Sequence, residues 1–129
     1  MDTIADMLTQ IRNAQAVFKE TVDVPFSEVK YRMVKILESQ GFIEKVLRRG
    51  RKPKKIIRVF LKYKDKEGGA ISGLKRVSKP GQRIYLRAKD IKPVRGGYGM
   101  GIISTPKGIM TNKEARKKRL GGEIICEVW

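Results

Sequence analysis

Apolar side chains near the N-terminus recur every three or four positions, which predicts a helix over about residues 4–18. The alternating segment 22–26 predicts a short strand, and Pro25 places it at a sheet edge because proline donates no ladder hydrogen bond. A second apolar stripe of helical spacing follows Ser27, a favourable N-cap, and ends at Gly41; its residues are Val29, Met33, Ile36 and Leu37. This order predicts a small α/β lobe.

Two alternating segments come next, at 42–47 and 56–63, and they predict the strands of a hairpin. The connection, 48–55, reads RRGRKPKK, and its glycine and proline disfavour regular structure. A polar turn follows at 65–69. We place the domain boundary there, which assigns residues 1–66 to an N-terminal α/β lobe and 67–129 to a C-terminal β-rich lobe.

The C-terminal lobe is predicted to contain short strands and turns. Residues 71–77 predict a strand and 79–81 a tight turn. Segment 82–88 alternates, with Arg83, Tyr85 and Arg87 on one face and apolar residues on the other. The glycines of 96–101 lack the spacing of a phosphate-binding loop, so we interpret them as sites of close backbone packing or a bulge.

The last third begins with an apolar run that leads into a hydroxyl-bearing turn, Ser104-Thr105-Pro106-Lys107-Gly108. Thr111 and Glu114 have the spacing of a capping box and predict a short helix that carries four cations at 116–119. Two glycines end it, and an alternating strand follows over 123–129. The chain is thus predicted to be an α+β protein of two small α/β lobes: a helix-strand-helix-hairpin lobe, and a mainly antiparallel β lobe with one short helix.

Positive charge is concentrated after the first third of the chain. The 30 basic residues exceed the 13 acidic ones, for a formal net charge of +17. Residues 1–44 hold five basic and seven acidic residues, whereas residues 45–62 hold nine basic residues and no acid. So dense a basic segment repels itself, and we favour a phosphate contact over a merely solvated loop. The surface that meets a polyanion is therefore expected in the last two thirds.

Residue types that the chain lacks narrow its function. It has no histidine, which removes the commonest general base, and one cysteine, which excludes an internal disulfide and a cysteine zinc cluster. We therefore expect no enzyme, no metal or other cofactor and no small-molecule substrate. Cys126 is expected to be a buried apolar residue on the same strand face as Ile124. No apolar run is long enough for a membrane span or resembles a signal peptide, which favours a cytoplasmic location.

The residues best suited to nucleic acid lie in the C-terminal lobe. The hydroxyls of Ser104 and Thr105 can read base edges or a ribose 2′-OH, and Gly108 permits a positive φ. The predicted helix start near Thr111 favours phosphate close by. Tyr85 between two arginines forms a stacking and phosphate-binding patch or, equally well, a solvent-exposed strand face. Glu123 either pairs with a nearby cation or orients a neighbouring hydroxyl.

Three separated stretches of the chain carry a family resemblance. They are 2–14 (DTIADMLTQIRNA), 80–85 (PGQRIY) and 97–123 (GYGMGIISTPKGIMTNKEARKKRLGGE). In order and spacing they resemble the motifs of the small-subunit ribosomal protein eight family. The resemblance spans essentially the whole chain, and it implies two small α/β lobes and a structural, non-catalytic role in the small ribosomal subunit.

The resemblance also implies an RNA target and the residues that contact it. Family members bind the central domain of the 16S-type rRNA early in assembly, helping to build the platform, and a hydroxyl loop contacts unstacked adenines. The implied RNA-binding positions here are Ser104, Thr105, Lys107, Gly108, Arg83, Tyr85, Glu123, Arg12, Asn13, Lys54 and Lys55, and Arg87 joins them by its place on the strand. The implied protein neighbours are the fifth and twelfth small-subunit proteins.

One position departs from the family pattern. The loop commonly reads Ser-Thr-Ser, and here Pro106 replaces the third hydroxyl and lacks a backbone N–H. Two other functions stay open from the residues alone. A general double-stranded nucleic-acid-binding module shares the charge but predicts no preference for looped RNA. A nucleic-acid-processing enzyme is disfavoured by the lack of histidine and of clustered carboxylates.

Overall fold

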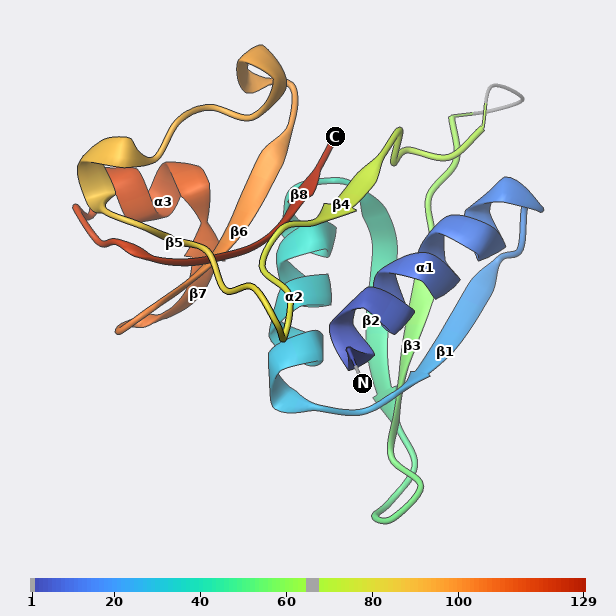
Figure 1. Ribbon diagram of the computed structural model, residues 1–129. Coiled ribbons are helices and arrows are strands. Elements are labelled where there is room, and N and C mark those ends of the chain that lie inside the picture. Colours follow the sequence, from blue (N-terminus) through green and yellow to red (C-terminus); the bar gives the residue numbers. More distant parts are fainter. Residues whose placement is uncertain (1, 65–67) are drawn as a thin grey trace. The chain divides into compact units, whose positions relative to one another are not determined.

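The computed structural model describes residues 2–64 and 68–129, and these fall into two compact units (Figure 1). The N-terminal unit is Thr3–Ile71, and the C-terminal unit is Ser72–Trp129 together with Asp2. The turn at which the sequence places the boundary lies partly outside the described residues. The three helices and the antiparallel sheets confirm the α+β class.

The N-terminal unit combines two helices with a three-stranded antiparallel sheet in the order β1-β3-β2. Its elements are α1 (Thr3–Ala16), β1 (Thr21–Pro25), α2 (Glu28–Ser39), β2 (Ile43–Arg49) and β3 (Ile56–Leu61). The edge position of β1 confirms the expectation from its proline. The predicted first helix is slightly long, because α1 ends before Phe18, which has a φ of 57°.

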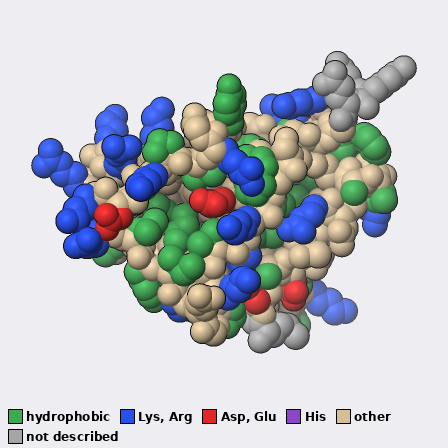
Figure 2. All heavy atoms as spheres, turned by 45° about the horizontal axis from the view of Figure 1, so that its top comes forward, with side chains coloured by type: hydrophobic (Ala, Val, Ile, Leu, Met, Phe, Trp, Pro, Cys, Tyr) green, Lys and Arg blue, Asp and Glu red, His purple; other side chains and the backbone are tan. Residues whose placement is uncertain are grey.

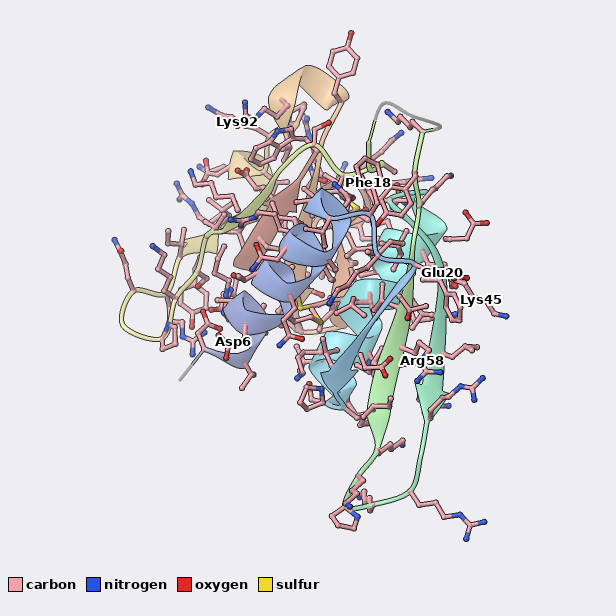
Figure 3. The ribbon with its side chains drawn as sticks, turned by 90° about the vertical axis from the view of Figure 1, so that its right-hand side faces the viewer. Asp6, Phe18, Glu20, Lys45, Arg58 and Lys92 are labelled. Carbon is pink, nitrogen blue, oxygen red and sulfur yellow. The ribbon has the colours of Figure 1, made fainter. Side chains whose placement is uncertain are left out.

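Both helices cover the same face of this sheet (Figures 1 and 3). Burial alternates along strand β3, as expected for a sheet that helices cover on one face. Ile57, Val59 and Leu61 are buried, and the residues between them are half-buried. Lys45 of β2 points away from the helices in Figure 3 and lies over the Phe60 ring, 5.7 Å from its centroid. The helices complete the core with seven buried apolar residues: Met7, Leu8, Ile11, Ala14, Met33, Val34 and Leu37.

Helix α2 begins as predicted and buries most of the expected stripe, except at its first position. The Ser27 side chain accepts a hydrogen bond from the Lys30 backbone N–H, so Ser27 is the N-cap. The expected burial of Met33 and Leu37 is confirmed, and Ile36 is half-buried, whereas Val29 is 43% exposed and Lys30 is buried. Burial lowers the pKa of the Lys30 amine, and the charge of Asp6 opposes that change in part.

The C-terminal unit is built on five antiparallel strands. Four follow the order β4-β8-β6-β7, and β5 also pairs with β8. The elements are β4 (Leu74–Arg76), β5 (Tyr85–Leu86), β6 (Met100–Thr105), β7 (Gly108–Thr111), α3 (Asn112–Lys117) and β8 (Gly122–Val128).

Several elements of this unit are shorter than the sequence predicts. Residues 74–76 of the expected strand 71–77 and residues 85–86 of the expected strand 82–88 form strands, and Gln82 adds an isolated bridge to Lys79. Exposure nevertheless alternates along 82–88 as expected, with Arg83, Tyr85 and Arg87 exposed. Helix α3 ends at Lys117, so only two of the four consecutive cations belong to it.

One apolar cluster of the C-terminal unit lies on the side of the sheet that α3 covers. Its buried residues are Ile91, Ile103, Met110, Ala115 and Ile124. The predicted cap holds the helix in place: the Thr111 hydroxyl accepts from the Glu114 backbone N–H at 3.1 Å. That hydroxyl also donates to the Glu114 carboxylate at 3.3 Å, so the glutamate reaches back to the side chain of the cap.

A register shift in the β6–β8 pair corrects the expected face of Cys126. Ile103 pairs with Ile124, but Ile102 pairs with Cys126, so β8 carries one additional residue at Ile125. Because Ile102 and Ile103 face opposite sides of the sheet, Cys126 and Ile124 do so as well. The expected burial of Cys126 is confirmed, and this burial raises the pKa of its thiol to about 12.

Candidate RNA interface

The turn between β6 and β7 consists of Pro106 and Lys107, and it brings Thr105 opposite Gly108. Gly108 adopts a φ of 113°, which confirms the expected need for glycine. The Thr105 hydroxyl donates to the Gly108 carbonyl at 2.8 Å and accepts from the Lys107 N–H at 3.1 Å. Thr105 is thus a buried residue whose hydroxyl shapes the turn from within.

Ser104 lies one position earlier and is half-buried. Among the residues that the structure describes, none hydrogen-bonds to its side chain. Adjacent residues of a strand face opposite sides, so Ser104 faces away from the apolar cluster that contains Ile103. Its hydroxyl is therefore the one of this turn that can donate to, and accept from, an outside molecule.

Ser104 belongs to a row of side chains that crosses four strands. It pairs with Ile109 of β7 and with Glu123 of β8, and Glu123 pairs in turn with Tyr85 of β5. Directly paired residues project from the same sheet face, so these four side chains lie side by side. We call Tyr85, Glu123, Ser104 and Ile109 the cross-strand row. The sheet assembles it from four segments that are separate in the sequence.

Gly122 allows β8 to lie close to β6 beside the cross-strand row. A Cβ atom at Gly122 would lie 2.1 Å from the Ser104 carbonyl oxygen and 3.1 Å from the Cα of Thr105. Both are backbone atoms, which cannot move aside as the end of a side chain can. Glycine at this position therefore sets how closely Glu123 can approach Ser104.

The Glu123 carboxylate organises the polar end of the row. Its Oε2 accepts from the Ser78 hydroxyl at 2.6 Å and from the Arg83 guanidinium at 3.1 Å. Ser78 is fully buried and also accepts from the Ile84 N–H at 2.9 Å. The sequence left two interpretations of Glu123 open, an ion pair or the orientation of a hydroxyl. In the structure Glu123 does both, since it pairs with Arg83 and holds the hydroxyl of Ser78.

Ser78 is a site residue that the sequence does not reveal. It stands just before the turn 79–81, where serine is an ordinary residue. Only its burial and its two hydrogen bonds show that it links the Ile84 backbone to Glu123.

Exposed groups around the row are of the kinds that can bind nucleic acid. Tyr85 is 68% exposed, and the side chain of Arg83 is 46% exposed although it is paired with Glu123. Lys107 is exposed at the turn. The arrangement can therefore stack a base on Tyr85, hold phosphate with Arg83 and Lys107, and hydrogen-bond through Ser104. Lys and Arg side chains crowd the side of the C-terminal unit in Figure 2.

Arg87 is held apart from this arrangement. Its guanidinium donates to Asp90 at 3.0 Å, just beyond the end of β5. The pair is largely exposed, and an exposed pair of this kind contributes little to stability. Arg87 is thus paired locally, whereas Arg83 is held by the row itself.

The four remaining candidate residues belong to the N-terminal unit. Lys54 is exposed in the turn between β2 and β3, whereas the Lys55 amine lies 3.9 Å from the centroid of the Phe26 ring. Arg12 and Asn13 are exposed on α1. The structure thus brings the C-terminal candidates other than Arg87 together around one row, and it assigns these four to separate elements of the other unit.

Other kinds of site find no support in the part of the chain that the structure describes. No cluster of three or more carboxylate or cysteine side chains there has the arrangement to bind a metal ion. Across the same residues, no helix has the length and apolar character needed to span a bilayer.

Comparison with known proteins identifies the family of this chain. The family model described as Ribosomal protein S8 matches residues 2–129. The small ribosomal subunit protein uS8 of Kosmotoga olearia is 52% identical over 133 residues, covering 99% of this chain and 98% of its own. The uS8 proteins of Dictyoglomus turgidum and Thermus thermophilus are 52% and 47% identical, each over 99% of this chain and 97% and 98% of their own. The chain therefore belongs to the ribosomal protein S8 family, a family of structural proteins of the small ribosomal subunit and not of enzymes.

Proposed function

We propose that this protein binds directly to the central domain of the 16S-type rRNA and helps to assemble the platform of the small subunit. Its target there is a helix with an internal loop, whose unstacked bases are open to side chains. The observation that carries the proposal is the cross-strand row. It sets the Ser104 hydroxyl, which has no partner among the described residues, beside the exposed Tyr85 ring and the Arg83 guanidinium that Glu123 holds.

The row separates affinity from recognition. Arg83 and Lys107 contact phosphates and supply binding that depends on salt. Ser104 and Tyr85 meet the bases, by hydrogen bonds and by stacking. Thr105 acts indirectly, because its hydroxyl fixes the turn that presents Ser104 and Lys107. Glu123 keeps Arg83 beside the row.

Replacing Ser104 by alanine tests the central contact. We expect the variant to bind an RNA hairpin that carries the looped central-domain helix more weakly by about 1–2 kcal/mol, because a buried polar contact is lost. Isothermal titration calorimetry or filter binding would measure the change. Ser39→Ala is the matched control, since Ser39 is exposed and lies on α2. Equal affinity for Ser104→Ala and for the unaltered protein would exclude this role of Ser104.

Competition separates this proposal from general duplex binding. Unlabelled plain duplex DNA of the same length should displace the looped RNA only at much higher concentration. Equal displacement by the two competitors would favour a general double-stranded nucleic-acid-binding module, which needs only the positive charge.

We also expect neighbouring small-subunit proteins to contact this chain, the fifth and twelfth being the first to test. An exposed apolar corner at the end of α1 is suited to such a contact: Val17 and Phe18 are 66% and 58% exposed, and Phe18 stacks on Tyr63 at 5.3 Å. A photo-crosslinking residue at position 18, followed by mass spectrometry of assembled subunits, would identify the neighbour. Crosslinks to rRNA alone would exclude a protein contact there.

A further inference from the structure

A cavity of about 590 Å³ opens between the segment 91–99 and α3. Its apolar part comes from Ile91, Pro93 and Val94, with the backbone of Gly97 and Gly99 beside them. This volume lies within the ~300–1,000 Å³ of typical small-ligand sites. The cavity shares no residue with the cross-strand row.

The walls of the cavity are held in place by hydrogen bonds. The Asn112 side chain donates to the Lys92 carbonyl at 3.1 Å and accepts from the Gly101 N–H at 3.0 Å. It thereby ties the start of α3 to both the segment 91–94 and strand β6. Because these bonds are made within the protein and fix its walls, little ordering would be needed to fill the cavity.

The rim of the cavity is strongly basic. Lys92, Lys113, Arg116 and Lys117 line it, all four are exposed, and none of the described residues lining it is acidic. None of the four forms an ion pair within the described part of the chain. The nearby Asp90 and Glu127 line a neighbouring cavity, and Asp90 is already paired with Arg87. The rim therefore favours an anion.

The loop above the cavity presents an aromatic ring to solvent. Tyr98 is 90% exposed and stands between Gly97 and Gly99, two residues that line the cavity. Gly97 has a φ of 98°, which residues other than glycine rarely adopt, so glycine is suited to the backbone conformation just before Tyr98. The base of the loop is anchored, because the Arg95 guanidinium lies 3.9 Å from the centroid of the Trp129 ring.

We propose that this cavity is a second RNA site, which receives one unpaired nucleotide. The base lies against Ile91, Pro93 and Val94, its flanking phosphates contact the basic rim, and Tyr98 stacks on the adjacent base. An apolar floor and a rim of several cations match a base with its phosphates better than they match an inorganic anion, which needs no apolar floor. The inference rests on the proposed function and adds a second contact surface to it.

Titration with a single-stranded hexa-adenylate, followed by NMR, tests the proposal on the full chain. We expect its addition to shift the amide signals of Gly97, Gly99 and Lys113. The double variant Arg116→Gln with Lys117→Gln should weaken this binding about ten-fold or more near 0.1 M salt, because two phosphate contacts are lost. Tyr98→Ala should weaken it about five-fold or more through the lost stacking.

The chain provides a matched control beside the site. Lys118→Gln with Arg119→Gln removes the same two charges from the next two residues, which do not line the cavity. We expect that pair to weaken hexa-adenylate binding less than about three-fold, as general electrostatics would. Equal losses for the two pairs would overturn the site.

Two further probes decide what the cavity takes. Inorganic phosphate that shifts the same amides as strongly as hexa-adenylate at equal concentration would reduce the site to a simple anion site and overturn the proposal. Hexaglutamate that displaces hexa-adenylate with equal affinity would point to an acidic protein segment and overturn it too. The second site and the proposed function can fail separately. If only the second site is wrong, Ser104→Ala still weakens binding to the looped helix. If the protein shows no preference for the looped helix, the proposed function itself is wrong.

Discussion

At the scale of single residues, the same hydroxyl chemistry serves two different purposes in one turn. Thr105 uses its hydroxyl within the turn, whereas that of Ser104 has no partner in the described part of the chain. Pro106 fits this turn because its restricted φ suits the first turn position. Pro106 thus lacks the hydroxyl that the third residue of the family's Ser-Thr-Ser loop carries, and it leaves the turn that presents Ser104 intact.

Gly122 gives a direct test of how closely β8 and β6 must approach. We expect Gly122→Ala to destabilise the protein by about 1–3 kcal/mol, because its Cβ would meet the Ser104 backbone. Gly81→Ala is the control, since nothing lies within 4 Å of a Cβ there. Urea unfolding of both variants measures the difference, and a Gly122→Ala protein as stable as Gly81→Ala would contradict the close approach.

The buried thiol of Cys126 should be unreactive in the folded protein. With its pKa raised to about 12, only about one thiol in ten thousand is ionised at pH 8, and the thiolate is the reactive form. A thiol-specific chromogenic reagent should therefore label the native protein far more slowly than the urea-unfolded protein. Similar rates in the two states would show that the strand is open.

At the scale of elements, the hairpin β2–β3 carries its cations in two different settings. Lys54 is exposed in the turn, while Lys55 is half-buried over the Phe26 ring and its carbonyl accepts from the Phe26 N–H at 3.1 Å. The basic segment is therefore the proposed phosphate contact of this unit and also part of the packing of the hairpin. A substitution there has to be interpreted at both levels.

We expect Lys54→Gln to reduce the salt dependence of binding to the looped RNA with little effect on stability. Each lost phosphate contact should lower the slope of log affinity against log salt by about 0.7–0.9. Lys55→Gln should also lower stability slightly, because a cation–π contact is worth about 0.5–1 kcal/mol at an exposed site. Binding at several salt concentrations and urea unfolding separate the two. An unaltered slope for both variants would exclude the hairpin from the interface.

At the scale of the whole molecule, the distribution of charge agrees with a structural role in the small subunit of the cytoplasmic ribosome. Two of the acidic residues, Asp23 and Glu38, form ion pairs that lower their pKa values. Arg58 hydrogen-bonds to Asp23 and lowers the pKa of that carboxyl, and Lys35, with the Val46 N–H, lowers the pKa of Glu38. A carboxyl whose pKa is lowered by folding stabilises the folded state above its unfolded pKa, and this contribution is lost as the pH falls through the folded pKa.

Stability should consequently fall on acidification from about pH 5 to pH 3, since the ordinary pKa values are 3.8 for Asp23 and 4.5 for Glu38. The double variant Asp23→Asn with Glu38→Gln should show a smaller fall. Glu20→Gln with Glu44→Gln is the control, because both residues are exposed and form no ion pair within the described residues. Urea midpoints at several pH values test this, and identical pH profiles for the two double variants would refute the assignment.

Local chemistry was readable from the sequence because it depends on neighbouring residues. The Ser27 and Thr111 caps, the glycine of the hydroxyl turn and the edge position of Pro25 all follow from short-range hydrogen bonds and sterics. Helical spacing likewise predicted both helices of the first unit. The three motifs predicted the family in the same way, since each is a continuous stretch of chain.

Only the tertiary structure decided which distant residues meet. Strand pairing set Tyr85, Glu123, Ser104 and Ile109 in one row, and the additional residue at Ile125 turned Cys126 away from Ile124. Burial selected Ser78 as the link to Glu123, although its sequence context is that of an ordinary turn. Register and burial depend on how a whole sheet packs, so no single segment contains the information that determines them.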